Sequence, residues 1–205
     1  MFDVDLLGIG LFIGVLLVSA TLHEMMHAYV AYRLGDDLAH SHGRISLNPF
    51  VHIDPMLTLA LPALLLLLGQ PPILAAKPVP INTSRIKAEE FGLATVGVAG
   101  PLTNLALAFI FGAITQVVSI GGIGGTILEL FVLVNVGLFV FNMLPIPPLD
   151  GSRLLYAVAP PSVQSFMRQL EALGIFGLVI ILIVLLPVIS PLLVNANEFI
   201  LNIVT

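Results

Sequence analysis

The sequence predicts an all-α membrane protein, a polytopic helical bundle with about four or five spans. Hydrophobic residues make up 58% of the 205-residue chain, and its mean hydropathy is +1.10. Charged residues make up only 9%, whereas soluble domains average about 25%. The apolar residues also gather in long stretches, and a helix needs about 20 such residues to cross a hydrocarbon core roughly 30 Å thick.

The first apolar stretch, Leu6–Tyr32, is long enough to span and is followed by Asp36 and Asp37, which favour a stop. The polar segment 39–55 holds three of the five histidines. Met56–Leu68 is apolar but too short to cross, so we expect a re-entrant or interfacial segment near 56–68.

A proline-rich loop covers 70–90, and the alternation in Lys77–Asn82 suits a short extended edge or hairpin strand, where proline is tolerated. Two long apolar stretches follow, separated by a glycine-rich turn at 121–125. Prolines break the second stretch, and a mixed segment with a surface helix comes next. The remaining expected spans are Phe91–Ser119, Thr126–Leu144 and Leu173–Leu186, with a short amphipathic tail at Pro191–Val204.

Composition excludes several classes of function. The formal net charge is −5, so no basic surface is expected to attract nucleic acid. The chain has no cysteine, which removes disulfides, thiolate catalysis and Cys-type zinc sites. Asp3 and Asp5 stand where a signal peptide would carry positive charge, so Leu6 onward is interpreted as a retained membrane helix. We expect one domain over 1–205, embedded in the lipid bilayer.

His23-Glu24-Met25-Met26-His27 lies inside the first apolar stretch. Residues four apart share a helix face, so His23 and His27 can offer two imidazole nitrogens to one Zn²⁺. Glu24 would be the general base and would then deliver a proton to the leaving amine. Charged residues cost about 2.5–3.5 kcal/mol or more at mid-bilayer, so their presence in a span indicates function. The alternative interpretation is structural: these residues lie at a helix end that emerges among the lipid headgroups, and the histidines reach toward the surface.

A catalytic zinc needs a third protein ligand. Asp150 follows the proline-broken end of a span, where irregular backbone can turn a carboxylate into the bundle interior. His52 and Asp54, on the loop after the first helix, remain alternatives. His40 and His42 are interpreted as solvated or backbone-bonded loop residues.

The position of the site predicts a topology. If His27 and Asp150 approach the same metal, the first and third long spans end at one membrane face and the second begins there. All seven Lys and Arg residues then fall on that face, which the positive-inside rule makes cytoplasmic. These residues are Arg33, Arg44, Lys77, Arg85, Lys87, Arg153 and Arg168.

Three separated motifs occur in order, HEMMHA at 23–28, GPLTN at 100–104 and NMLPIPPLDG at 142–151. In these motifs the chain resembles the site-2 protease family of intramembrane zinc metalloproteases (peptidase family M50). It is most similar to the compact prokaryotic members without PDZ or CBS domains. The runs at 43–55 and 76–82 are similar as well, so the resemblance covers roughly residues 10–155.

The resemblance implies that His23, His27 and Asp150 hold one Zn²⁺ per chain and that Glu24 is the catalytic base. It also places Asn104 in the active site, where an amide could bind the substrate carbonyl or a developing oxyanion. The alternative for Asn104 is an interhelical hydrogen bond, and Asn142 is expected to brace the broken helix.

The substrates implied are transmembrane proteins of the cell membrane, cut in or near their spans close to the cytoplasmic face, as in regulated intramembrane proteolysis. Two other functions stay open. A membrane metal transporter or metal-binding protein could use the same histidines, although no ladder of acidic residues or histidines reaches the far face. A non-catalytic relative could bind membrane helices, although the intact Glu24 argues against it.

Overall fold

The computed structural model describes residues 6–54, 77–118 and 120–205, and every regular element in these ranges is helical. The predicted all-α fold is therefore confirmed, while the segment expected near 56–68 lies outside the described residues. The elements are α1 (Leu6–Arg33), α2 (Leu38–Ser41), η1 (Pro49–His52), η3 (Thr83–Arg85), α4 (Glu89–Val117), α5 (Gly122–Asn142), α6 (Gly151–Val158), α7 (Pro161–Ala172) and α8 (Gly174–Val204).

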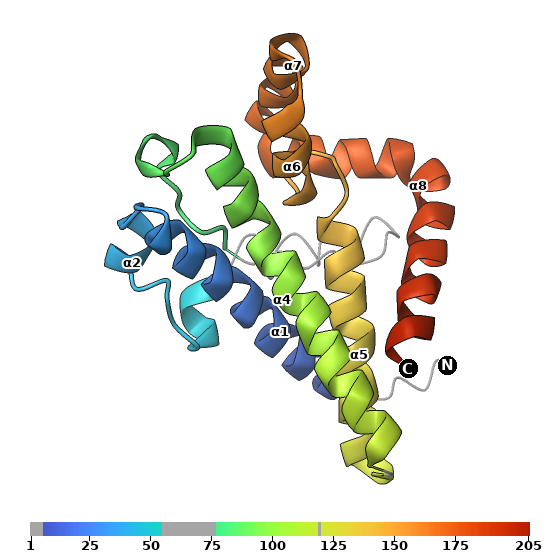
Figure 1. The fold of residues 1–205 in the computed structure, drawn as a ribbon. Coiled ribbons are helices and arrows are strands. Elements are labelled where there is room, and N and C mark those ends of the chain that lie inside the picture. Colours follow the sequence, from blue (N-terminus) through green and yellow to red (C-terminus); the bar gives the residue numbers. More distant parts are fainter. Residues whose placement is uncertain (1–5, 55–76, 119) are drawn as a thin grey trace.

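Three of these helices, α1, α4 and α5, are long and apolar enough to cross a membrane. Each of them packs against the other two, and they alternate in direction, so α1 and α5 end toward the side from which α4 starts (Figure 1). Large apolar side chains such as Leu6, Ile110 and Leu133 are exposed on their outer faces. Such surfaces suit lipid rather than water, so the chain is a helical membrane protein.

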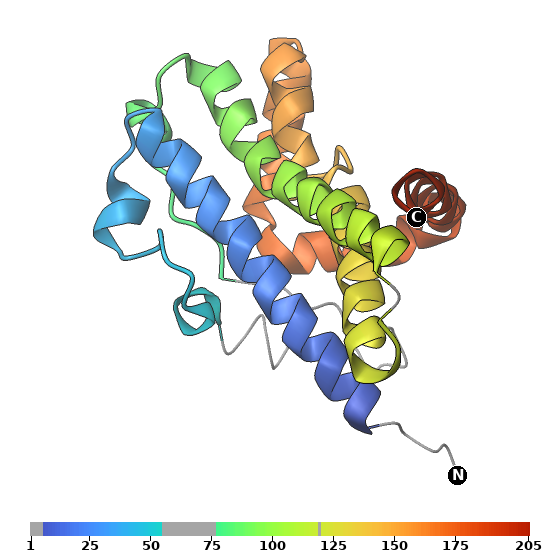
Figure 2. The same ribbon diagram turned by 60° about the horizontal axis from the view of Figure 1, so that its bottom comes forward.

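The C-terminal region differs from the expected span at Leu173–Leu186 and separate tail. α8 is one continuous helix with Pro187 and Pro191 inside it. It first runs across the bundle and then turns to run beside α5 (Figures 1 and 2). A proline removes one intrahelical hydrogen bond and kinks a helix without necessarily ending it. The tail is also held by packing, since Val204 is buried in an apolar cluster with residues of α4 and α5.

The contact between α4 and the end of α8 depends on Gly112. A Cβ at this position would overlap Cγ1 and the carbonyl oxygen of Val204. We expect Gly112→Ala to push α8 outward and to lower the free energy of unfolding by about 1–3 kcal/mol, as overpacking does. The unfolding midpoint in detergent measures this effect. Gly137→Ala is the matched control, because a Cβ there meets nothing within 4 Å; equal midpoints would contradict the packing.

Two buried charged residues join the loops that follow α1. Asp36 accepts hydrogen bonds from the backbone N–H groups of Leu38, at 3.0 Å, and Asn82, at 2.6 Å. Arg44 donates to the carbonyls of Val51 and Pro78. No described residue is in a β-strand, so the strand expected at Lys77–Asn82 is not observed there. That segment is instead fixed to the α1 end of the bundle by side chains.

Candidate metal centre

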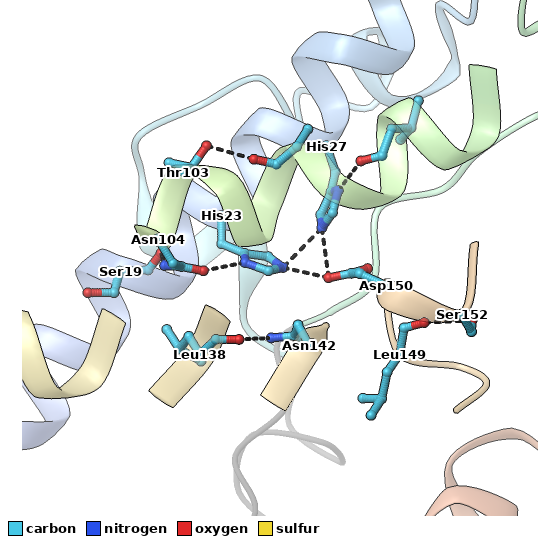
Figure 3. Close-up of polar contacts among 12 residues, drawn as sticks. Ser19, His23, His27, Thr103, Asn104, Leu138, Asn142, Leu149, Asp150 and Ser152 are labelled. Atoms are coloured by element: carbon cyan, nitrogen blue, oxygen red, sulfur yellow. Dashed lines mark hydrogen bonds and ion pairs between the residues drawn. The ribbon is translucent and has the colours of Figure 1, made fainter. Parts of the chain in front are cut away.

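Three predicted ligands meet although they come from distant parts of the chain. His23 and His27 lie one turn apart on α1, and Asp150 lies at the start of α6, just beyond the proline-rich end of α5. The Nε2 atoms of the two histidines are 3.0 Å apart. Oδ2 of Asp150 lies 3.0 Å from Nε2 of His23 and 3.3 Å from Nε2 of His27 (Figure 3).

These separations fit the coordination geometry of zinc. Zinc lies about 2.0–2.2 Å from histidine nitrogen and carboxylate oxygen, so two ligand atoms of a tetrahedral site are about 3.3 Å apart. The three observed separations, 3.0, 3.0 and 3.3 Å, are close to that edge length. Within 6–54, 77–118 and 120–205, His23, His27 and Asp150 are the group of histidine and acidic residues that could hold a metal.

The other ring nitrogen of each histidine is already engaged. Nδ1 of His23 donates to Oδ1 of Asn104 at 2.5 Å, and Nδ1 of His27 donates to the carbonyl of Val96 at 2.7 Å. An imidazole that donates from Nδ1 keeps a lone pair on Nε2, the tautomer that a metal requires. Both rings are buried and held by α4 in an orientation that directs Nε2 toward Asp150.

The carboxyl group of Asp150 is half-buried beside these imidazoles. Burial raises its pKa, but the positive charge of a protonated His27 or His23 beside it lowers it by more, so the pKa of Asp150 falls below its ordinary range. The group is therefore an anion at neutral pH, which is the form that binds a metal.

Helix α4 lies close behind the cluster because two of its positions nearest to the cluster, 97 and 100, are glycines without a side chain. A Cβ at Gly100 would overlap Nε2 of His27 and lie 2.5 Å from Nε2 of His23. A Cβ at Gly97 would lie 2.9 Å from Cβ of Arg153 and 3.1 Å from the carbonyl oxygen of Asp150. The two glycines thus leave room for a metal and for the start of α6.

Asn104, expected in the active site, lies beside the cluster, in contact with His23. Its side chain is fully buried, with its oxygen on His23 and its Nδ2 donating to Oδ1 of Asn135 at 2.8 Å. This is the place of a residue that orients His23, and it includes the interhelical hydrogen bond considered as the alternative. Asn142 donates to the carbonyl of Leu138 on its own helix at 3.0 Å.

The loop histidines lie outside the cluster. His40 stacks on Tyr32, with ring centroids 4.7 Å apart. His42 donates to the carbonyl of Leu38 at 2.8 Å, and His52 donates to the carbonyl of Ser46 at 2.9 Å. Of the candidates for the third ligand, the structure brings Asp150 to the histidines, and it does not bring His52 or Asp54 there.

Sequence reasoning missed the carbonyl of Val96, as well as Ser19 and Asn135, which continue the hydrogen-bond network behind Asn104. A backbone carbonyl has no sequence signal. Asn135, however, is an amide inside an apolar span, and a polar residue in such a place marks a functional or packing contact.

Comparison with known proteins places this sequence in a family. No family model and no solved structure match the chain. YwhC of Bacillus subtilis, named as a zinc metalloprotease, is 39% identical over 170 residues, covering 78% of this chain and 74% of its own length. Rip2 of Mycobacterium tuberculosis H37Rv, named likewise, is 34% identical over 182 residues, covering 86% and 68%. The chain therefore belongs to the family of zinc metalloproteases that includes YwhC and Rip2.

Proposed function

We propose that the protein is an intramembrane zinc endopeptidase of the site-2 type, peptidase family M50. It would cut transmembrane proteins in or near their spans, close to the cytoplasmic face of the cell membrane. The observation that carries this proposal is the cluster of His23, His27 and Asp150, with three donor atoms at zinc spacing inside a bundle of membrane helices.

The residues of the site have different proposed roles. Nε2 of His23, Nε2 of His27 and a carboxylate oxygen of Asp150 would hold one zinc ion per chain. When bound, zinc supplies a Lewis acid for the scissile carbonyl and lowers the pKa of water toward about 7. Glu24 is half-buried and follows His23, so it flanks the helix face that bears the ligands. It would accept the proton of the attacking water and pass it to the leaving amine.

The depth of the site supports cleavage near one face. The end of α1 carries exposed Tyr29, Tyr32 and Arg33, and such residues mark a membrane–water interface. With a rise of 1.5 Å per residue, His27 lies about 9 Å along the helix from Arg33. The peptide bonds of a helix are shielded by their own hydrogen bonds. A substrate helix would therefore have to unwind locally before one of its carbonyls could enter the site at this depth.

The distribution of charge supports a cytoplasmic orientation. All seven Lys and Arg residues lie at the end of α1 or in segments 34–88 and 151–172. Of the described elements of these segments, α2, η3, α6 and α7 lie toward the end of the bundle where α1 and α5 finish (Figure 1). The positive-inside rule assigns that end to the cytoplasm.

Metal analysis followed by proteolysis tests the proposal. We expect the purified protein to contain one zinc ion per chain and to cleave a single-span substrate reconstituted in the same vesicles. A chelator should stop cleavage and added zinc should restore it, because zinc would polarise the scissile carbonyl and lower the pKa of the attacking water. Zinc flux into vesicles without proteolysis would instead indicate a transporter, and an absence of bound zinc would overturn the proposal.

A further inference from the structure

A line of buried polar side chains leads away from His23 into the apolar interior of the bundle. Asn104 on α4 donates from Nδ2 to Oδ1 of Asn135 on α5 at 2.8 Å. Asn135 in turn donates from Nδ2 to Oγ of Ser19 on α1 at 2.9 Å and to the carbonyl of Phe131 at 2.8 Å. Ser19, Asn104 and Asn135 are each 0% exposed. The three long helices thus each contribute one polar residue to this line.

The direction of these hydrogen bonds is fixed at the far end. The carbonyl of Phe131 can only accept, so it requires the NH₂ group of Asn135 on its side and leaves Oδ1 of Asn135 facing Asn104. An oxygen there requires the NH₂ group of Asn104, which turns the oxygen of Asn104 toward His23. Nδ1 of His23 must then carry the proton, and Nε2 keeps the lone pair.

The opposite orientation of Asn104 would disable the ligand. Its NH₂ group would face His23, Nδ1 would have to accept, and the proton would move to Nε2, where zinc should bind. Outer contacts of this kind tune metal sites, and their loss typically costs 10–100-fold in metal affinity or activity.

We propose that Asn135 is a positioning residue for the zinc site, acting through Asn104 to keep His23 in the metal-binding tautomer. The proposal rests on the proposed zinc-binding role of His23. It also explains why two amides are retained in the apolar interior, where polar groups are costly unless they have partners. The side chain of Ser19 contributes less, because the Phe131 carbonyl alone sets the orientation of Asn135. The backbone carbonyl of Ser19, 3.5 Å from Nδ2 of Asn104, favours the same orientation of Asn104.

Zinc affinity of the metal-depleted, detergent-solubilised protein tests this inference. Measured by competition with a chromogenic chelator, Asn135→Leu should bind zinc about tenfold more weakly, at the lower end of the range for outer contacts. The visible spectrum of the Co²⁺-loaded variant should also change. Asn135→Asp should restore the affinity, because a protonated carboxyl can still donate to Phe131 and accept from Asn104. If the leucine variant does not fold, Asn135→Ala removes the same acceptor without added bulk.

Two comparisons separate positioning from a purely structural role. Gln116→Leu is the control, because the exposed Gln116 on α4 is another side-chain amide that donates hydrogen bonds to a second helix, to the carbonyls of Val204 and Thr205. It should leave zinc affinity unchanged. In the background of Asn104→Leu, Asn135→Leu should cause no further loss. Unchanged affinity in a folded Asn135→Leu protein, or an additive loss, would overturn the inference, whereas failure of the unmodified protein to bind zinc would overturn the proposed function itself.

Discussion

Glu24→Gln should abolish peptide-bond cleavage while leaving one zinc ion bound per chain. Glutamine keeps the size of the side chain but cannot accept a proton, and general acid–base groups contribute about 10²–10⁴-fold in rate. The contacts among His23, His27 and Asp150 that define the site do not involve Glu24. Metal content and the cleavage rate of a single-span substrate, measured on the same preparation, test both halves of this expectation.

The control for Glu24→Gln should remove a carboxylate from another span. Glu129 lies on α5 and is exposed, several turns before the end that approaches the site, so Glu129→Gln should cleave at the unmodified rate. Normal turnover by Glu24→Gln would remove Glu24 from the role of base. Loss of zinc from that variant would show that the carboxylate helps to hold the metal.

Sequence patterns located the spans because their hydrophobicity is a local property. The first span was predicted to end at Tyr32, and α1 ends at Arg33. The span expected from Thr126 begins at Gly122, because the glycines interpreted as a turn join the helix. The largest difference is α8, where prolines were taken to end a helix that they only interrupt. The end of α8 is held in place by the packing of Val204 against α4 and α5. Such packing cannot be recognised from local composition.

In the site too, local features could be predicted from the sequence and long-range contacts could not. Spacing on a helix predicted that His23 and His27 share a face, and the proline-rich turn predicted that Asp150 could reach them. The sequence did not reveal that the oxygen of Asn104 faces His23, nor that Gly100 lies against both rings. These contacts depend on how α4 is rotated and how closely it approaches α1, which in turn depends on the whole bundle.

Gly100→Ala should remove zinc from the protein without unfolding it. The added methyl group would overlap Nε2 of His27 and lie 2.5 Å from Nε2 of His23. Zinc itself must lie about 2.0–2.1 Å from both nitrogens, so the methyl group and the metal would compete for the same space. We expect zinc affinity to fall by about 100-fold or more, the upper end of the range for outer contacts, because the methyl group displaces the metal itself.

Stability distinguishes this blocked site from general damage. The three nearest atoms that a Cβ at Gly100 would meet belong to histidine rings, which can shift without moving the backbone, unlike the Val204 carbonyl at Gly112. Within a helix, alanine is more favourable than glycine by about 0.5–1 kcal/mol, which offsets part of the cost of that shift. Metal-free Gly100→Ala should therefore unfold at a midpoint close to that of the metal-free parent protein. Gly14→Ala in α1 is the matched control, since a Cβ there meets nothing within 4 Å, and it should keep both zinc and activity. A Gly100→Ala protein that binds zinc normally would show that the metal does not lie between α1 and α4. A collapse of its unfolding midpoint would show that the histidines cannot move aside, and that Gly100 serves packing as much as metal binding.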